Sequence, residues 1–253
     1  MRLPVELTPP TALLVDMDDT LLDSHSAGEL AWGKVAGLLG SVVAREPAQV
    51  RAELAAANAW FWSDGARASG GRHDQAGARL TIAERACESL GVDPVLVPTD
   101  LGLRFLAWRL EHLSPFPGAI ETLRQLRGEG VRLALVTNGE AGAQREKIAK
   151  FRLDQEVDTV LVEGELGFGK PDPRVFDLAL ERLGCTVRDA WIVGDDLQWE
   201  VVGGRRYGFA SVWVNARDRE LPADLELPPH HEVRSVAELP QLIEACRESS
   251  PTG

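Results

Sequence analysis

Three closely spaced carboxylates follow a short apolar run near the start of the chain. The stretch ALLVDMDDTLLD, residues 12–23, carries Asp16, Asp18 and Asp19 within four positions. Like charges this close repel one another, and a buried carboxylate without a partner is costly. The stretch must therefore either reach solvent or hold something positive.

Further polar residues follow other apolar runs. The run VRLALVTNG ends in Thr137 and Asn138, and the run DAWIVGDD ends in Asp195 and Asp196. Lys170 follows TVLVEG, in the loop GKPDP. In an open parallel sheet, ligands bind outside the carboxyl ends of the strands, so these side chains are expected at one edge.

The residue types at this edge suit phosphoryl chemistry. Carboxylates from two different strands can converge on one hard cation, and all-oxygen ligands favour Mg²⁺ over zinc. A hydroxyl, an amide and an ammonium group beside them are suited to hold a phosphoryl group.

Alternating strands and helices must position these residues. Buried strands are predicted over 11–16, 131–139, 159–164, 189–196 and 210–215, with 231–235 as a last edge strand. Helical patterns cover 118–130, 140–151, 173–184, 200–208 and 236–246. This alternation predicts an α/β fold, a parallel sheet with helices on both faces.

A second pattern, helical throughout, occupies residues 24–112. Its apolar positions recur at helical spacing, and no convincing strand interrupts them. We therefore expect two domains: an α/β core made of residues 1–23 and 113–253, and an inserted helical domain over 24–112. Within the insert, glycines break the pattern over 61–80 and predict a loop, in which Arg72 is a candidate for binding a substrate carboxylate or second phosphate.

Four stretches resemble, in order and spacing, the four motifs of the haloacid dehalogenase-like (HAD) hydrolase superfamily. They are DMDDT (16–20), LVTNG (135–139), GKPDP (169–173) and VGDD (193–196). The resemblance covers nearly the whole chain and implies a Rossmann-like core with its first strand central. The helical insert resembles the cap that lies between the first two motifs in one subfamily. Glu200 departs from the pattern, because the fourth motif usually carries a second Asp there.

The resemblance implies a Mg²⁺-dependent phosphatase with Asp16 and Asp18 as its catalytic residues. Asp16 would attack phosphorus and form an aspartyl-phosphate. Asp18 would protonate the leaving oxygen and then take a proton from the hydrolytic water. Asp16, Asp195 and the backbone carbonyl of Asp18 would hold Mg²⁺. Asp19 is expected to face solvent in the turn.

The resemblance also implies which residues bind the phosphoryl oxygens. Thr137 and Lys170 would hold them, assisted by Asn138 and backbone N–H groups. Lys147 competes with Lys170 for this role, but its place in EAGAQREKIAKF is also that of an ordinary charged helix face. We favour Lys170 because it lies in a loop at the ligand edge of the sheet.

Other functions on the same fold remain open. A 2-haloacid dehalogenase also uses the first Asp but normally lacks a carboxylate at the second position, where this chain has Asp18. A hexose-phosphate mutase keeps both aspartates, yet its usual basic cap lysine is missing here. A phosphonate hydrolase needs a cap lysine for a Schiff base, and Lys34 is the only lysine between 21 and 146. A non-catalytic binding protein would not need the complete set of carboxylates.

The composition limits the partners. The chain has 253 residues and a formal net charge of −12, which is unsuited to nucleic acid because phosphates favour a basic face. No apolar run approaches the length that spans a bilayer, and the N-terminal residues lack a signal-peptide pattern. We expect a cytoplasmic enzyme acting on a small phosphorylated metabolite, with no nucleic-acid or membrane partner and an oligomeric state that the sequence does not indicate.

Overall fold

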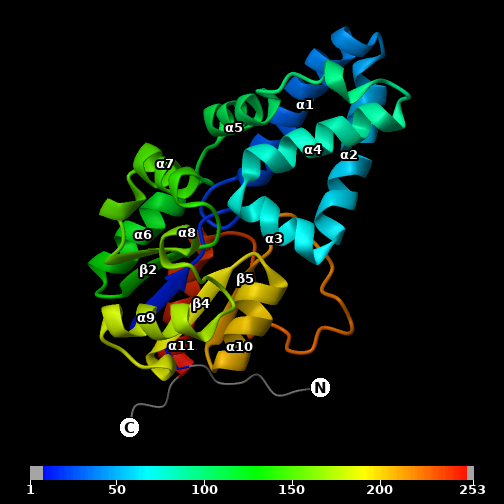
Figure 1. The fold of residues 1–253 in the computed structure, drawn as a ribbon. Helices are drawn as coiled ribbons and strands as arrows, with labels where there is room; N and C mark the ends of the chain where they lie inside the picture. Colours follow the sequence, from blue (N-terminus) through cyan, green and yellow to red (C-terminus); the bar gives the residue numbers. More distant parts are fainter. Residues whose placement is uncertain (1–7, 250–253) are drawn as a thin grey trace. The chain divides into compact units, whose positions relative to one another are not determined.

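The computed structural model describes residues 8–249 (Figure 1). The chain divides into two compact units. The first, called the sheet unit below, comprises the residues up to Asp23 together with those from Pro115 onward. The second, called the helical unit, comprises Ser24–Ser114.

The sheet unit is built on a six-stranded sheet in the order β3-β2-β1-β4-β5-β6, in which every neighbouring pair is parallel. The strands are β1 (Ala12–Val15), β2 (Arg132–Thr137), β3 (Thr159–Val162), β4 (Ala190–Gly194), β5 (Ala210–Val214) and β6 (His231–Val233). Each lies within its predicted range, and the first strand is central. The expected α/β class is confirmed.

Helices connect the strands. They are α6 (Ala119–Gly128), α7 (Ala141–Phe151), α8 (Glu163–Leu166), α9 (Pro173–Leu183), α10 (Gly203–Tyr207) and α11 (Leu239–Ser249). A π-helical turn, Leu197–Val202, precedes α10, and single 3₁₀ turns cover Leu153–Gln155, Val187–Asp189 and Val236–Glu238. Crossover connections of this kind are what parallel pairing requires, because the chain must return to the same end of the sheet before each strand begins.

Both faces of the sheet are buried. On one face, Leu14 and Ile192 share an apolar cluster with Phe176 of α9. Neighbouring residues on a strand point to opposite faces. Leu13 and Leu133 are nevertheless fully buried, so the opposite face is covered as well. Such strands are apolar on both sides, which explains their continuous hydrophobic runs in the sequence.

The register of β1 brings the polar residues to one edge. Val15 pairs with Leu135 of β2 and with Val193 of β4. The next residue, Asp16, still donates its backbone N–H to the carbonyl of Val193 at 2.9 Å. The carboxyl ends of β1, β2 and β4 therefore lie at nearly the same level, so the polar residues that follow these strands meet at one edge of the sheet.

The two chain segments that flank the helical unit are joined within the sheet unit. Leu22 forms an antiparallel bridge with Pro115. Phe116 donates its N–H to the carbonyl of Leu21 at 2.9 Å. The point where the chain leaves the sheet unit and the point where it returns are thus adjacent.

The helical unit contains α1 (Ser24–Val43), α2 (Pro47–Ser63), α3 (Gly65–His73), α4 (Gln75–Ser89) and α5 (Leu101–His112), with a 3₁₀ turn at Pro94–Leu96. It has an apolar core of its own, to which α1, α2, α4 and α5 contribute. No helix within residues 8–249 is both long and apolar enough to cross a membrane.

The prediction of a loop over residues 61–80 was wrong, because α2, α3 and α4 together occupy nearly all of that range. Asp64 caps α3 by accepting the N–H of Arg67 at 2.9 Å. The break in the helical pattern is therefore the boundary between α2 and α3 at Asp64, and no long loop is present there. Gly71 is instead a packing position, since a Cβ there would lie 2.6 Å from the ring of Phe61. Arg72 therefore lies on a helix.

Candidate active site

The turn after β1 presents Asp16 and Asp18. Leu21 and Leu22 donate their N–H groups to the carbonyl of Met17 at 2.9 and 3.0 Å, which folds the chain back tightly. Asp19 has a φ of 63°, in the left-handed region that Asp tolerates better than most residues.

The expectation that Asp19 faces solvent was wrong. Arg217 donates to its carboxylate at 2.6 Å and also lies 3.7 Å from Asp23. The sequence gives no sign of this contact, because Arg217 lies in the segment after β5.

Asp16 is paired with a buried lysine. The Nζ of Lys170 lies 2.5 Å from Oδ1 of Asp16, 2.6 Å from the carbonyl of Val136 and 2.8 Å from Oε1 of Glu200. The side chains of Lys170 and Glu200 are each only 1% exposed. Burial by itself lowers the pKa of the Lys170 ammonium, but the charges of Asp16 and Glu200 raise that pKa above its usual range. Lys170 is therefore a fixed positive charge.

Asn138 holds the backbone of this lysine. Its Nδ2 donates to the carbonyl of Lys170 at 2.7 Å, and its Oδ1 accepts the N–H of Lys170 at 2.8 Å. Gly169 makes this contact possible, because a Cβ there would lie 2.4 Å from the Asn138 Oδ1. The side chain expected to assist phosphate binding is thus engaged in positioning Lys170.

Asp18 has a lysine partner of its own on α7. Lys147 Nζ lies 2.8 and 2.6 Å from the two carboxylate oxygens of Asp18. Gln144 Nε2 lies 3.0 Å from Asp18 Oδ2 and 2.5 Å from Oγ1 of Thr137. Gln144 and Lys147 are three residues apart and share one helix face. Glu140 caps this helix by accepting the N–H groups of its first turn.

Lys147 is therefore part of the site. The sequence had favoured an ordinary charged helix face for it instead. Its side chain is 7% exposed, whereas a solvated surface lysine would be largely exposed. The signal available in the sequence was the Gln-x-x-Lys spacing on the first helix after β2, at the ligand edge of the sheet.

Asp195 follows β4 and lies in a crowded negative environment. Its backbone carbonyl accepts from Trp213 Nε1 at 2.9 Å and from Arg219 at 2.5 Å. Burial, followed by the charges of Asp16, Glu200 and Asp19, raises the pKa of Asp195 to about 8. Among the described residues, the positive group nearest to its carboxylate is that of Arg219, at 3.4 Å.

Glu200 stands on the π-helical turn and points back toward β4. Its Oε2 accepts the N–H of Asp196 at 2.9 Å, and Lys170 lies at its other oxygen. A Cβ on Gly194 would lie 2.3 Å from Glu200 Cγ, so the glycine admits this side chain. Burial is the main cause of the raised pKa of Glu200. Glu200, which stands in place of the usual Asp, thus forms an ion pair with Lys170.

The donor set fits Mg²⁺. No cluster of three or more His, Cys, Asp or Glu side chains suited to a metal occurs among residues 8–249, so the expected set offers two carboxylates, Asp16 and Asp195, with the backbone carbonyl of Asp18. Mg²⁺ keeps several waters and is usually held by one or two carboxylates, so a small oxygen set suffices. Burial, followed by the charges of Asp16, Glu200 and Asp19, raises the pKa of Asp195, and a bound cation would favour its charged form.

The structure thus connects five of the expected site residues in two groups. Asp16 with Lys170, Lys170 with Asn138, and Asp18 with Thr137 through Gln144 form these contacts. Gln144, Arg217 and Arg219 were not foreseen from the sequence, whereas Lys147 was weighed there as a phosphate ligand and Glu200 as a departure from the fourth motif.

Comparisons with known proteins agree with this geometry. The profile of the haloacid dehalogenase-like hydrolase family matches residues 10–208. The chain belongs to this family. The expected family and the expected class of enzyme are confirmed.

Named HAD relatives include phosphatases and dehalogenases. The chain is 33% identical over 246 residues to a phosphoserine phosphatase of Thermus thermophilus, which covers 90% of this chain and 96% of that protein. It is 32% identical to the pyrimidine 5'-nucleotidase YjjG of Escherichia coli, over 63% of this chain and 68% of the relative. It is 31% identical to an (S)-2-haloacid dehalogenase of Burkholderia cepacia, over 53% and 57%.

Solved HAD structures share the fold. The HAD-hydrolase YfnB of Bacillus subtilis superposes with a TM-score of 0.74 at 23% identity, covering 93% of this chain and 99% of that one. The dehalogenase of Xanthobacter autotrophicus with covalently bound chloropropionic acid superposes with a TM-score of 0.66 at 19% identity, covering 93% and 98%. At this identity the likeness shows a common fold.

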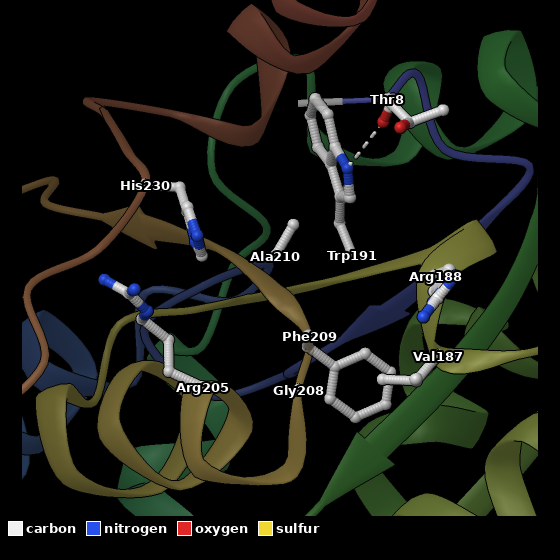
Figure 2. Close-up of a pocket in the computed structure, with 9 residues that line it drawn as sticks. All are labelled: Thr8, Val187, Arg188, Trp191, Arg205, Gly208, Phe209, Ala210 and His230. Carbon is white, nitrogen blue, oxygen red and sulfur yellow. Dashed lines mark hydrogen bonds between the residues drawn. The ribbon is translucent and has the colours of Figure 1, made fainter. Parts of the chain in front are cut away.

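A separate cavity of about 340 Å³ lies near the amino ends of β4, β5 and β6 (Figure 2). Trp191 at the start of β4, Ala210 at the start of β5, Arg205 and His230 line part of it. None of the candidate active-site residues lines it. It is therefore distinct from the site at the carboxyl ends of the strands.

Proposed function

We propose that this HAD hydrolase is a Mg²⁺-dependent phosphatase that acts on a small phosphorylated metabolite through an aspartyl-phosphate. The observation that carries the proposal is that two carboxylates of one turn, Asp16 and Asp18, each have a separate ammonium partner. A nucleophile and an acid/base need different environments, and different partners provide them.

Asp16 is the nucleophile in this mechanism. Lys170 holds one of its carboxylate oxygens, Oδ1, so the other oxygen is the one that attacks phosphorus. The bond from Asp16 to phosphorus forms as the bond from phosphorus to the leaving oxygen breaks, and that oxygen takes a proton from Asp18. Water then attacks phosphorus and gives a proton to Asp18, and the bond to Asp16 breaks. The products are an alcohol and inorganic phosphate.

Lys147 and Thr137 bind the phosphoryl group. Thr137 Oγ1 accepts from Gln144, which leaves its own hydrogen to donate to a phosphoryl oxygen. Lys147 turns from Asp18 to the phosphoryl oxygens when substrate enters, and Asp18 is then free to carry a proton. Lys170 supplies a fixed charge and Asn138 positions it.

The chain offers ligands for Mg²⁺ in this reaction. Asp16, Asp195 and the backbone carbonyl of Asp18 would hold it. When bound, the metal offsets the negative charge of the transferring phosphoryl group.

The named relatives support this class of substrate. They include enzymes named for phosphoserine, N-acylneuraminate 9-phosphate and glyceraldehyde 3-phosphate. A small phosphorylated metabolite is common to these names, and we propose the same class for this chain.

The test is phosphate release from p-nitrophenyl phosphate with Mg²⁺, in EDTA, and by Asp16→Asn. We expect Mg²⁺-dependent turnover that the variant loses by roughly four orders of magnitude or more, because an amide cannot replace the nucleophile. The melting temperature of Asp16→Asn serves as the folding control. Full activity in EDTA, or turnover by the variant within tenfold of wild type without deamidation, would contradict the mechanism. Chloride release from 2-chloropropionate in EDTA would favour a dehalogenase instead.

A further inference from the structure

The backbone carbonyl of Asp195 accepts hydrogen bonds from two side chains outside its own strand. Gly194 of β4 pairs with Trp213 of β5, which brings Trp213 next to the residue that precedes Asp195. Trp213 Nε1 donates to the Asp195 carbonyl at 2.9 Å, and Arg219 Nη2 donates to the same oxygen at 2.5 Å. The main chain of this expected Mg²⁺ ligand is therefore fixed by the neighbouring strand and by the segment that follows it.

Arg219 contacts the carboxylate of Asp195 less closely than the carbonyl. Its Nη2 lies 3.4 Å from Oδ2 of Asp195, compared with 2.5 Å for the carbonyl oxygen. Strong hydrogen bonds between a guanidinium and a carboxylate are about 2.7–2.9 Å long. The closer contact thus fixes the main chain of Asp195 and leaves its carboxylate available to a cation.

A buried asparagine fixes the position of Arg219. Asn215 directly follows β5 and is 1% exposed. Its Nδ2 donates to the carbonyl of Arg219 at 2.9 Å, and its Oδ1 accepts the N–H of Arg219 at 2.8 Å. The guanidinium of Arg219 also lies 5.5 Å from the ring centre of Trp213. Arg219 is therefore attached to the sheet, although it lies in the segment between β5 and β6.

The same arrangement occurs at Lys170. Asn138 directly follows β2 and bonds both backbone polar groups of Lys170, whose ammonium contacts Asp16. Asn215 bonds both backbone polar groups of Arg219 in the same way. A cation that only balanced surface charge would not need its main chain fixed at the end of a strand. The repeated arrangement indicates that Arg219 has a positioning role.

We propose that Arg219 is a positioning residue of the Mg²⁺ site, where it holds the main chain of Asp195 so that the carboxylate can bind the metal. This inference rests on the proposed function, in which Asp195 is a Mg²⁺ ligand. The charge of Arg219 by itself would repel a divalent cation bound at Asp195. Positioning therefore predicts weaker metal binding when Arg219 is removed, whereas an effect of charge alone predicts tighter binding.

The test is the binding of Mn²⁺, which uses the same oxygen ligands as Mg²⁺. Electron paramagnetic resonance measures the free Mn²⁺, and competition gives the affinity for Mg²⁺. We expect Arg219→Met to bind both ions roughly tenfold to a hundredfold more weakly than wild type, the usual effect of removing a group that orients a metal ligand. Its kcat on p-nitrophenyl phosphate should return nearly to the wild-type value at saturating Mg²⁺, because Asp16 and Asp18 are unchanged.

Three further variants separate positioning from charge and from folding. Arg219→Lys keeps the charge without the planar fork and should recover part of the affinity; it also provides the comparison if Arg219→Met does not fold. Asn215→Ala keeps the charge of Arg219 but removes the hydrogen bonds that fix it, and should also weaken Mn²⁺ binding. Arg234→Met is the matched control, since Arg234 is an exposed arginine that pairs with Asp218, the residue before Arg219, at 2.5 Å. It should bind Mn²⁺ as wild type does.

Melting temperatures in EDTA show which variants are folded, and the affinities of those variants decide the inference. Weaker binding by Arg219→Met, with kcat restored by excess Mg²⁺, supports it. Wild-type affinity in Arg219→Met and Arg219→Lys, tighter binding by Arg219→Met, or an equal loss in Arg234→Met would overturn it and leave the phosphatase proposal standing. If wild type binds neither ion, the metal requirement fails and the inference fails with it. If wild type binds the ions but hydrolyses no phosphate ester, the phosphatase proposal fails and the affinities still decide the inference.

Discussion

Replacing Glu200 by Gln should weaken both the fold and the reaction. Glu200 Oε1 lies 2.8 Å from Lys170 Nζ, with both side chains buried. At an effective dielectric constant of about 20, charges at that distance attract by about 6 kcal/mol. The cost of burying the carboxylate and its repulsion by Asp16 offset part of this attraction. Removing one member of a buried pair costs about 3–5 kcal/mol when the other is left alone.

Lys170 is not left alone, because Asp16 and the Val136 carbonyl still accept from it. The amide of Gln can also keep one contact with Lys170, but its NH₂ would then face the Asp196 N–H, which now donates to Glu200 Oε2. An unmatched buried donor costs about 1–3 kcal/mol. We expect Glu200→Gln to lower the free energy of unfolding by about 2–3 kcal/mol, which corresponds to a fall in Tm of roughly 4–12 °C.

The activity should fall as well, because Asp16 becomes the only carboxylate beside Lys170 and is held more tightly as a nucleophile. Urea denaturation monitored by tryptophan fluorescence measures the stability, and phosphate release measures kcat. Glu200→Asp is the control that keeps the charge but shortens its reach to Lys170. Wild-type stability and kcat in Glu200→Gln would show that the Lys170–Glu200 contact contributes to neither, and would refute the reasoning.

Two other predictions concern Lys147 and His230. Lys147→Met should lower kcat/KM by roughly tenfold or more, since it removes a charged donor to the phosphoryl group; an unchanged kcat/KM with a normal Tm would exclude that role. His230 Nδ1 accepts the N–H of Ser211 at 3.0 Å, and burial, with the charges of Arg205 and His231, lowers the pKa of His230 to about 4. In the unfolded chain a His binds a proton near pH 6.5. The neutral form of His230 therefore adds fully to the free energy of unfolding above that pH, and this contribution declines as the pH falls toward 4. Proton NMR, assigned with His230→Gln, checks this, and a folded pKa of 6.5 or above would contradict it.

The strands and the order of the site motifs were predictable because they depend on local pattern. Buried parallel strands are continuous apolar runs, and all six strands fall within the predicted ranges. Asp16, Asp18 and Lys170 follow from residue type and from their place at strand ends. The contact between Asp16 and Lys170 then follows from the parallel topology, although the residues are far apart in the chain.

The partners of these residues were not predictable in the same way. Lys147 and Gln144 lie on a helix whose sequence also suits a solvated face, and only the fold shows that this face is buried against Asp18. Glu200 stood out in the sequence only as a departure from the fourth motif, whereas the structure shows it in a buried ion pair with Lys170. The α3 helix was missed because glycine signals both loops and close packing, and the ring of Phe61 decides between them.

The bridge between Leu22 and Pro115 has a consequence for how such a protein can change over generations. Because the chain leaves and re-enters the sheet unit at adjacent points, the segment between them can lengthen, shorten or be exchanged without altering the path of the strands. Closing a longer insert costs little, since the entropy of closure grows only with the logarithm of length. The helices of the inserted unit and the residues at the carboxyl ends of the strands therefore occupy separately replaceable parts of the gene. Recombination at this junction can exchange the insert while Asp16, Asp18 and Lys170 stay in place.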